Sequence, residues 1–353
     1  MPEFGLAGAE TMCENLTYEL VNKGNEVIVV SLYNFHSPIT ERIENSNIPL
    51  LYLNKKPGLD ISIIKKIRNI IKQYRPDIVH THRYLLKYVA IAVVGLNIKS
   101  IVHTVHNIAQ KENNLVDRYI NKIIFKCKQA VPVALSKEIQ STISEVYNFP
   151  VNELPVVFNG FSIKDVSPKI EYSFKDKIRI INVGRYTSVK NQLSLIEAVN
   201  KLHKENSEIE LNIYGDGPLK AELNQKIKEL KAENYIHENG LTDKVTEKLR
   251  ESDIFILPSV YEGMPMTIIE AMSLGLPIIA SNVGGIPDMI EDGRNGLLCN
   301  TNVESIYSSL KLLIENEQLR ETLGRGALIQ AEVFSAEQMA KSYVELYNRL
   351  INN

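Results

Sequence analysis

The amino-acid sequence predicts an α/β protein built from two doubly wound, parallel-sheet domains. Short apolar runs alternate with longer helix-forming runs along the chain, as they do when each strand is followed by a covering helix. Residues 254–280 show this best, because an apolar run, a loop, a helix-forming run and a second apolar run follow one another there. The length of 353 residues allows two to three domains, each with its own core.

The amino-terminal half supplies the first domain, which we place at residues 1–161. A helix over 9–23, closed by Gly24, precedes a first strand at 26–32. Further strands are expected at 48–53, 77–80, 101–106, 130–135 and 154–158.

The carboxyl-terminal half supplies the second domain, residues 162–334, of which 162–175 form the linker. A last helix is expected over 335–353. The strands of this domain are expected at 178–184, 210–214, 254–258 and 276–280.

Composition narrows the class of protein. The scattered cysteines Cys13, Cys127 and Cys299 include no Cys-x-x-Cys pair, which disfavours a disulfide scaffold or a zinc site and fits a reducing compartment. No run approaches the ~20 apolar residues of a membrane span, and no signal peptide is recognised. We therefore expect a cytoplasmic protein. A net charge of -2 and the lack of a reader motif disfavour nucleic acid as a partner.

Charge is nevertheless uneven along the chain. Residues 1–170 contain 20 Lys and Arg against 15 Asp and Glu, and the remainder contains 20 against 27. Residues 55–75 alone hold seven basic residues and one acid, with isoleucines at helical spacing between them. The simpler interpretation is a helix that covers the sheet and has a solvated basic face. The alternative is peripheral contact with anionic lipid at the inner face of the membrane, through Lys65, Lys66, Arg68 and Lys72.

Two carboxylates, Glu262 and Glu270, lie in and after the loop that follows strand 254–258. Parallel sheets bind ligands at the carboxyl ends of their strands, where this loop falls. A carboxylate in the loop and another in the helix can hold two hydroxyl-bearing parts of one ligand. Taken alone, such a pair is more typical of a solvated helix face, so its weight depends on its surroundings.

Two cations accompany the carboxylates. Arg185 follows strand 178–184, and Lys190 precedes a helix over 192–203. Each could be an ordinary surface cation beside a turn. Because helical N–H groups also point outward at such a strand-to-helix junction, the two cations are well suited to bind a diphosphate.

Together these residues resemble the signature of the retaining glycosyltransferases of the two-domain GT-B fold, in particular glycosyltransferase family 4 (glycosyl transferases group 1). Glu262 and Glu270 match the family's two glutamates separated by seven residues, and Gly184–Arg185 with Lys190 match its diphosphate motif. Residues 215–218 and 284–288 match further loops in the family's order. Residues 237–241 match the family's next strand and the loop that contacts the nucleotide base. The resemblance implies two Rossmann-like domains that face a central cleft, an acceptor-side first domain, a second domain that binds the nucleotide sugar, and a last helix that crosses back.

The resemblance also implies roles for individual residues. Arg185 and Lys190 would neutralise the leaving diphosphate, and Glu270 would bind the ribose. Glu262 and the backbone amides near it would hold the donor sugar, and His106 would line the sugar pocket. The implied catalytic set is His106, Arg185, Lys190 and Glu262, and the implied donor-binding set is Gly8, Arg185, Lys190, Leu241, Glu262, Gly263, Met264, Met266, Thr267 and Glu270.

The beginning of the chain departs from the family pattern. The family starts with a strand that leads into a Gly-Gly loop, whereas here Met1–Phe4 runs directly into Gly5, and Ala7–Gly8 replaces the glycine pair. The first strand of the first domain is therefore expected to be missing. A first strand is normally central in such a sheet, so its loss should leave neighbouring strands unpaired.

The implied activity is transfer of a sugar, with retention, from a nucleotide-diphosphate sugar to a hydroxyl acceptor such as a sugar or a lipid-linked saccharide. A UDP-sugar is the favoured donor and GDP-mannose the next, in the synthesis of bacterial cell-surface polysaccharide or glycolipid. No Asp-x-Asp occurs, so the cations are expected to replace a metal, and no cofactor is expected. A nucleotide-sugar epimerase and a non-catalytic subunit of a transferase complex remain alternatives. A dehydrogenase is disfavoured because no Gly-x-Gly-x-x-Gly follows an amino-terminal strand.

Overall fold

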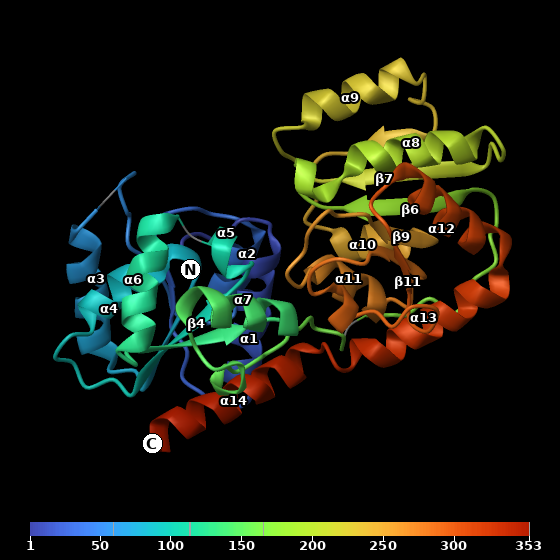
Figure 1. Ribbon diagram of the computed structural model, residues 1–353. Helices are drawn as coiled ribbons and strands as arrows, with labels where there is room; N and C mark the ends of the chain where they lie inside the picture. The colour runs from blue at the N-terminus through green and yellow to red at the C-terminus, as the bar shows by residue number, and fades with distance from the viewer. Residues whose placement is uncertain (59, 113, 165, 353) are drawn as a thin grey trace. The chain divides into compact units, whose positions relative to one another are not determined.

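The computed structural model describes residues 1–352 except residues 59, 113 and 165, and it divides into two compact units (Figure 1). Unit 1 comprises Met1–Gly160 and Ala336–Asn353, and unit 2 comprises Phe161–Ser335. Both units have parallel sheets with helices against them, so the α/β fold class predicted from the sequence is confirmed. In the described part of the chain no helix is both long and apolar enough to cross a membrane.

Unit 2 contains one sheet of six parallel strands in the order β11-β10-β9-β6-β7-β8. Strand β6, the first of the unit, pairs with β7 on one side and β9 on the other. The strand order therefore reverses beside β6, and ligands bind at such a switch point in open α/β sheets. The strands are β6 (Ile178–Val183), β7 (Ile209–Tyr214), β8 (Ile236–Glu238), β9 (Ile254–Leu257), β10 (Ile278–Ser281) and β11 (Leu297–Cys299).

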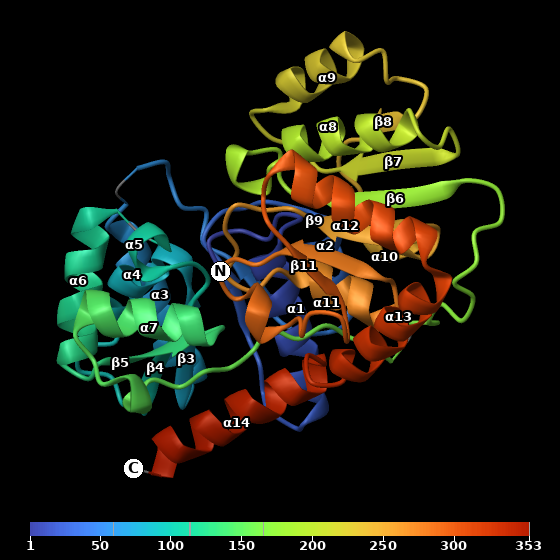
Figure 2. The same cartoon turned by 45° about the vertical axis from the view of Figure 1, so that its right-hand side comes forward.

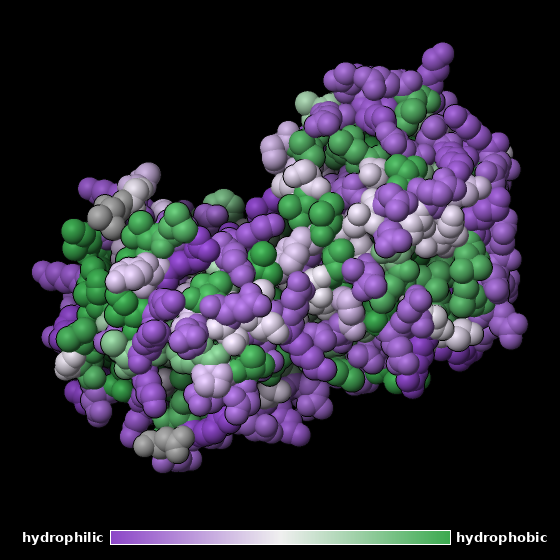
Figure 3. Space-filling model, viewed as in Figure 1, coloured by the Kyte–Doolittle hydropathy of each residue, from purple (hydrophilic) through white to green (hydrophobic). Residues whose placement is uncertain are grey.

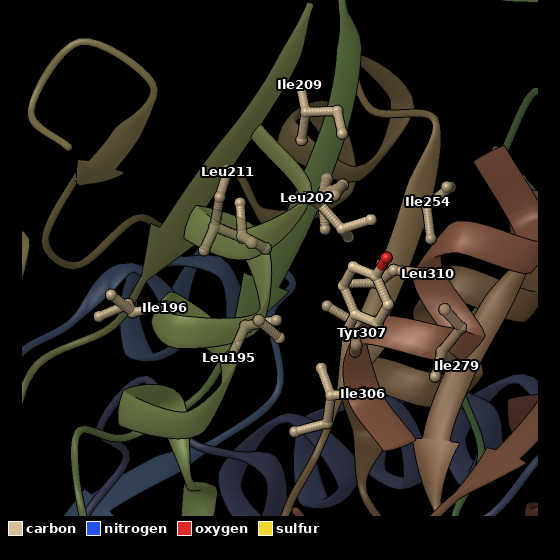
Figure 4. Close-up of a cluster of buried hydrophobic side chains, with 14 of the residues drawn as sticks. Leu195, Ile196, Leu202, Ile209, Leu211, Ile254, Ile279, Ile306, Tyr307 and Leu310 are labelled. Carbon is tan, nitrogen blue, oxygen red and sulfur yellow. The ribbon is translucent and has the colours of Figure 1, made fainter. Parts of the chain in front are cut away.

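Two helices, α8 (Gln192–His203) and α12 (Val303–Glu315), pack their apolar sides together against one face of this sheet. Buried aliphatic side chains from both helices and from the strands form one continuous cluster there, which is the core of unit 2. Figure 4 shows Leu195, Ile196 and Leu202 of α8, Ile306, Tyr307 and Leu310 of α12, and Ile209, Leu211, Ile254 and Ile279 of the strands.

Further helices complete the layers of unit 2. Helices α10 (Val245–Arg250) and α11 (Met266–Ser273) pack together on the opposite face of the sheet (Figure 2). Helix α13 (Glu317–Ala331) packs against α11, and α9 (Lys220–Glu229) lies beside α8 and β8.

Unit 1 contains two separate parallel sheets. In one, β1 (Val29–Ser31) pairs with β2 (Leu50–Tyr52), and in the other β4 (Ser100–Val105) lies between β3 (Ile78–His82) and β5 (Ala130–Ala134). The helix α14 (Ala336–Asn352) packs against α1. The other helices are α1 (Gly8–Asn22), α2 (Pro38–Asn45), α3 (Ser62–Tyr74), α4 (Leu86–Ala92), α5 (Ala109–Glu112), α6 (Leu115–Lys126) and α7 (Lys137–Tyr147).

The strands expected in unit 1 at 26–32 and 154–158 differ most from the structure, and the one expected at 48–53 is shortened to Leu50–Tyr52. The strand expected at 154–158 is reduced to a single bridge between Val156 and Ala134, because Pro155 has no N–H to donate to a ladder. The strand expected at 26–32 is shortened to Val29–Ser31, since its first residues make no ladder with β2.

The sheet of the first domain is divided into β1-β2 and β3-β4-β5, but the expectation that the missing strand leaves its neighbours unpaired is wrong at the edge of β1. The Met1 amino group donates a hydrogen bond to the Val30 carbonyl oxygen at 2.9 Å, and the Leu32 N–H donates one to the Met1 carbonyl oxygen at 3.2 Å. Met1 and Phe4 are buried in a cluster with Val29. Met1–Phe4 is thus packed into the fold beside β1. Strand β3 pairs with β4 along one edge, and among the described residues no strand pairs with its opposite edge.

Gly324 of α13 generates a test of the packing in unit 2. A Cβ there would overlap the Gly275 carbonyl oxygen and the Tyr172 ring. We expect Gly324→Ala to lower the free energy of unfolding by about 1–3 kcal/mol, although alanine is the better helix former. Thr322→Ala, at an exposed position of the same helix, should change it by less than about 0.5 kcal/mol. Urea denaturation measures the free energy of unfolding of the wild type and both variants. If Gly324→Ala were as stable as Thr322→Ala, the close contact at Gly324 would be contradicted.

Candidate functional site

An ion pair joins the ends of the two strands at the switch point of unit 2. Lys190 Nζ lies 2.5 Å from Glu262 Oε1, and the Ser259 hydroxyl donates to the same oxygen at 2.5 Å. Glu262 is only 8% exposed. A nearly buried carboxylate needs such partners, so its position depends on both of these side chains.

The backbone around Lys190 is fixed by its neighbours. A short 3₁₀ turn, Ser188–Lys190, ends at Asn191, which has a left-handed φ of 57°. The Asn191 amide donates to the carbonyl oxygens of Pro258 at 3.1 Å and Thr301 at 2.7 Å. Sequence reasoning gave Asn191 no role of its own. The preference of asparagine for left-handed conformations is the signal that could have identified it.

Glycines allow chain segments to approach this pair closely. The Lys190 stem passes over Gly184, where an added Cβ would lie 3.4 Å from Lys190 Cδ. Gly284 has a φ of +62°, and a Cβ there would overlap the Glu262 carbonyl oxygen. The Gly285 N–H donates to that oxygen at 3.1 Å. The loop at 284–285 therefore closes over Glu262.

Glu270 is a buried carboxyl group without a complete set of partners. It lies in α11 and is 7% exposed, and its Oε2 has no hydrogen-bond partner among the described residues. Burial raises the pKa of Glu270 to about 7. An unsatisfied buried carboxyl is costly, and such groups are concentrated at binding sites, where a ligand hydroxyl can satisfy them.

The first turn of α11 lies between the two glutamates. Pro265 precedes the helix, and in the described structure no side chain caps its first N–H groups. Met264 and Met266 are buried, while Gly263 and Thr267 are partly exposed. The uncapped backbone N–H groups of this turn, at the positive end of the helix dipole, therefore follow the loop that carries Glu262.

The other residues predicted for unit 2 do not contact the ion pair directly. Arg185 is exposed, and no ion pair of its guanidinium occurs among the described residues. Leu241 is 61% exposed beyond the end of β8. Glu238 shapes the loop before it by accepting hydrogen bonds from the Tyr186 hydroxyl at 3.0 Å and the Gly240 N–H at 2.9 Å.

Gly8 and His106 belong to unit 1. Gly8 begins α1 and is exposed, and His106 follows β4. His106 Nε2 lies 3.0 Å from His82 Nδ1. Burial, followed by the neighbouring His103, lowers the pKa of His106 to about 3, so its imidazole is neutral near pH 7. In the described residues no three His, Cys, Asp or Glu side chains are grouped as a metal would require.

Comparison with known proteins identifies the family. The model of the family described as Glycosyl transferases group 1 matches residues 164–328, and that of Glycosyltransferase Family 4 matches residues 6–165. An uncharacterized glycosyltransferase of Methanocaldococcus jannaschii is 33% identical over 281 residues, covering 72% of this chain and 69% of the relative.

Two further proteins are similar over most of the chain. The UDP-Gal:alpha-D-GlcNAc-diphosphoundecaprenol alpha-1,3-galactosyltransferase of Escherichia coli is 27% identical, covering 80% of this chain and 79% of the relative. The structure of Anabaena HepE in complex with UDP and glucose superposes with a TM-score of 0.83 at 18% identity, covering 99% and 98% of the two chains. The chain therefore belongs to glycosyltransferase family 4 and has the GT-B fold of these enzymes.

Proposed function

We propose that this protein is a retaining, metal-independent hexosyltransferase that moves a sugar from a UDP-sugar to a hydroxyl of a saccharide or a lipid-linked saccharide. The observation that carries the proposal is the Lys190–Glu262 pair at the switch point, followed in α11 by the unpartnered carboxyl oxygen of Glu270. GDP-mannose is the next candidate donor. Synthesis of cell-surface polysaccharide or glycolipid is the proposed setting.

The comparisons support a uridine nucleotide as the donor. The similar Anabaena structure holds UDP and glucose, and the similar Escherichia coli enzyme is named for UDP-Gal and a diphosphoundecaprenol-linked sugar. Glu270 suits the ribose, because a buried carboxylate oxygen without a partner among the described residues can accept a hydrogen bond from a sugar hydroxyl. The exposed Leu241 would lie against the base.

The diphosphate would redistribute the charges of the site. In the structure, Glu262 balances Lys190. A bound diphosphate would attract Lys190 and the exposed Arg185, which leaves Glu262 able to accept hydrogen bonds from the donor sugar. Further donors around the same ligand would be the amides near Gly8 and the backbone N–H groups of Gly263, Met264, Met266 and Thr267.

Transfer then requires no protein nucleophile. The bond between the anomeric carbon and the diphosphate oxygen breaks while the acceptor oxygen bonds to the same face of that carbon. The acceptor proton passes to the leaving phosphate oxygen. Lys190 and Arg185 stabilise the charge that develops on the diphosphate, and neutral His106 would hydrogen-bond to the transferred sugar.

A peripheral membrane contact at the cytoplasmic face is also part of the proposal, with a smaller set of cations than the sequence suggested. Arg68 donates to the carbonyl oxygens of Ala92 and Val94 at 2.8 and 2.7 Å, and Lys66 donates to that of Leu53 at 2.5 Å. Lys66 and Arg68 are thus held by backbone carbonyl groups of unit 1, and we leave them out of the proposed lipid contact. Lys65 and Lys72 are exposed and remain the candidates for contact with lipid.

Replacement of the two cations tests their catalytic role. We expect Arg185→Ala or Lys190→Ala to slow transfer by a few hundredfold or more, since a charge contact to the transition state is worth roughly 3–4 kcal/mol. Lys190→Ala should also lower stability, because Glu262 loses its ion pair. Arg250→Ala, at another exposed arginine of unit 2, is the matched control and should retain activity. Near-native turnover of both site variants would contradict the assignment.

Product analysis without an acceptor distinguishes transfer from epimerisation.

Metal independence gives a second test. With a purified enzyme and an identified donor, transfer should continue in excess EDTA, because the two cations take the place of a metal on the diphosphate. Activity that disappears in EDTA and returns with magnesium or manganese would refute this part of the proposal.

The carboxyl of Glu270 gives a third test. Its pKa of about 7 means that it is mostly protonated below that pH and mostly ionised above it. Because the ionised form is the better acceptor for ribose hydroxyls, the affinity for UDP should rise with pH through neutrality, by up to roughly tenfold per pH unit below the pKa. Glu270→Gln should bind UDP weakly with a flatter pH profile. Calorimetric titration with UDP at several pH values measures the affinity of the wild type and of Glu270→Gln. If the affinities of the two proteins changed with pH in the same way, Glu270 would not be the group that binds the ribose.

A further inference from the structure

The helix α6 exposes an apolar ridge that the family activity does not explain. Leu115, Val116, Tyr119 and Ile123 are 76%, 68%, 68% and 47% exposed, and we call these four residues the α6 ridge. They recur at helical spacing on one side of α6, whereas its buried side consists of Asp117, Asn121, Ile124 and Phe125. Figure 3 shows hydrophobic residues gathered over this part of unit 1.

The helix that carries the α6 ridge is fixed in unit 1 by a cap and by an ion pair. The Asn114 side chain caps α6 by accepting a hydrogen bond from the Asp117 N–H at 2.9 Å. The Lys87 ammonium donates to both carboxylate oxygens of Asp117, at 2.7 and 2.9 Å. The helix also packs against α4, which exposes Ile91 by 56%, and Val94 just beyond α4 is 60% exposed. The ridge is therefore a fixed apolar surface of the folded unit.

The charged residues in and beside α6 along the chain are mostly basic. Residues 111–128 contain five basic residues and only two acids, Glu112 and Asp117. Asp117 is buried and paired with Lys87, and Glu112 Oε1 is buried. Over residues 51–128 there are 15 Lys and Arg against 4 Asp and Glu. The side that α6 presents to solvent is thus apolar and cationic.

We propose that the α6 ridge inserts into the interfacial layer of an anionic lipid bilayer, with Lys122 and Lys126 among the headgroups. Leucine, valine, isoleucine and tyrosine gain from leaving water at this depth, and lysines extend toward anionic headgroups. A second copy of the chain fits the surface less well, because it would bring two cationic rims together.

This inference rests on the proposed function in one respect, the lipid-linked acceptor. A cavity of about 370 Å³ lies next to the first turn of α6, and its lining includes Tyr84, Lys87, Glu112 and Asn114. Tyrosines, a carboxyl and an amide can bind sugar hydroxyls and the faces of sugar rings. A ridge held in the bilayer would bring this cavity to the surface where such an acceptor is presented.

Sedimentation with lipid vesicles tests the inference on the whole 353-residue chain. We expect binding to phosphatidylcholine vesicles that contain phosphatidylglycerol and little binding to pure phosphatidylcholine. Leu115→Ser/Val116→Ser/Tyr119→Ser should reduce the partition coefficient by about tenfold or more. The control, Ile170→Ser/Ile329→Ser/Val333→Ser, changes three exposed residues of unit 2 and should bind like the wild type.

Two other variants separate this surface from the cations of α3. Lys122→Gln/Lys126→Gln should weaken binding chiefly at low salt, whereas Lys65→Gln/Lys72→Gln should have the smaller effect. The inference is overturned if the ridge variant binds vesicles like the wild type. It is also overturned if the wild type is a dimer that the ridge variant converts to a monomer, because the ridge would then be a protein interface.

A second measurement on the same proteins distinguishes membrane binding from donor binding. It is the increase in unfolding temperature that UDP causes. The ridge variant should keep the wild-type protection. Loss of vesicle binding with normal UDP protection supports the inference, and failure of UDP to protect even the wild type would count against the proposed donor alone.

Discussion

The site in unit 2 depends on one ion pair, between Lys190 and Glu262. It joins the turn after β6 to the loop after β9, the two strands that meet where the strand order reverses. Asn191 and Gly284 hold the backbone on either side of it. Because the carboxylate is nearly buried, neither partner can move without a replacement for the charge of the other. A diphosphate would replace Glu262 as the anionic partner of Lys190, and hydroxyls of the donor sugar would then hydrogen-bond to Glu262. The contact that organises the site is therefore also the one that donor binding would change.

The buried carboxyl group of Glu270, in contrast, does not have hydrogen-bond partners for both of its oxygens among the described residues. Its Oε2 has no partner among the described residues, and burial raises its pKa. Such a group lowers stability in the absence of ligand, and a bound hydroxyl removes part of that cost. The packing of α11 against α13 keeps this carboxyl in place, since Gly275 and Gly324 let the two segments approach closely.

Unit 1 combines an interrupted sheet with a cationic and apolar surface. Met1 bonds to the edge of β1, and no described strand covers the outer edge of β3. His80 at that edge is held by Tyr347 and Thr104, at 2.7 Å each, which connects β3 and β4 to the last helix. His80 is therefore a structural residue, whereas His106 directly follows the carboxyl end of β4.

The sequence by itself determined the fold class and the alternation of strands and helices, because buried strands and strand-to-helix loops leave local patterns. The residues of the candidate site in unit 2 were predicted from the resemblance to a family, and the structure brings Lys190 and Glu262 together. Strand ends were less predictable, as Pro155 shows, since pairing depends on a distant partner. Only the tertiary structure showed the pairing of Lys190 with Glu262, the internal bonds of Lys66 and Arg68, and the exposure of the α6 ridge. These features depend on which side of an element meets another part of the chain, and a local pattern does not contain that information.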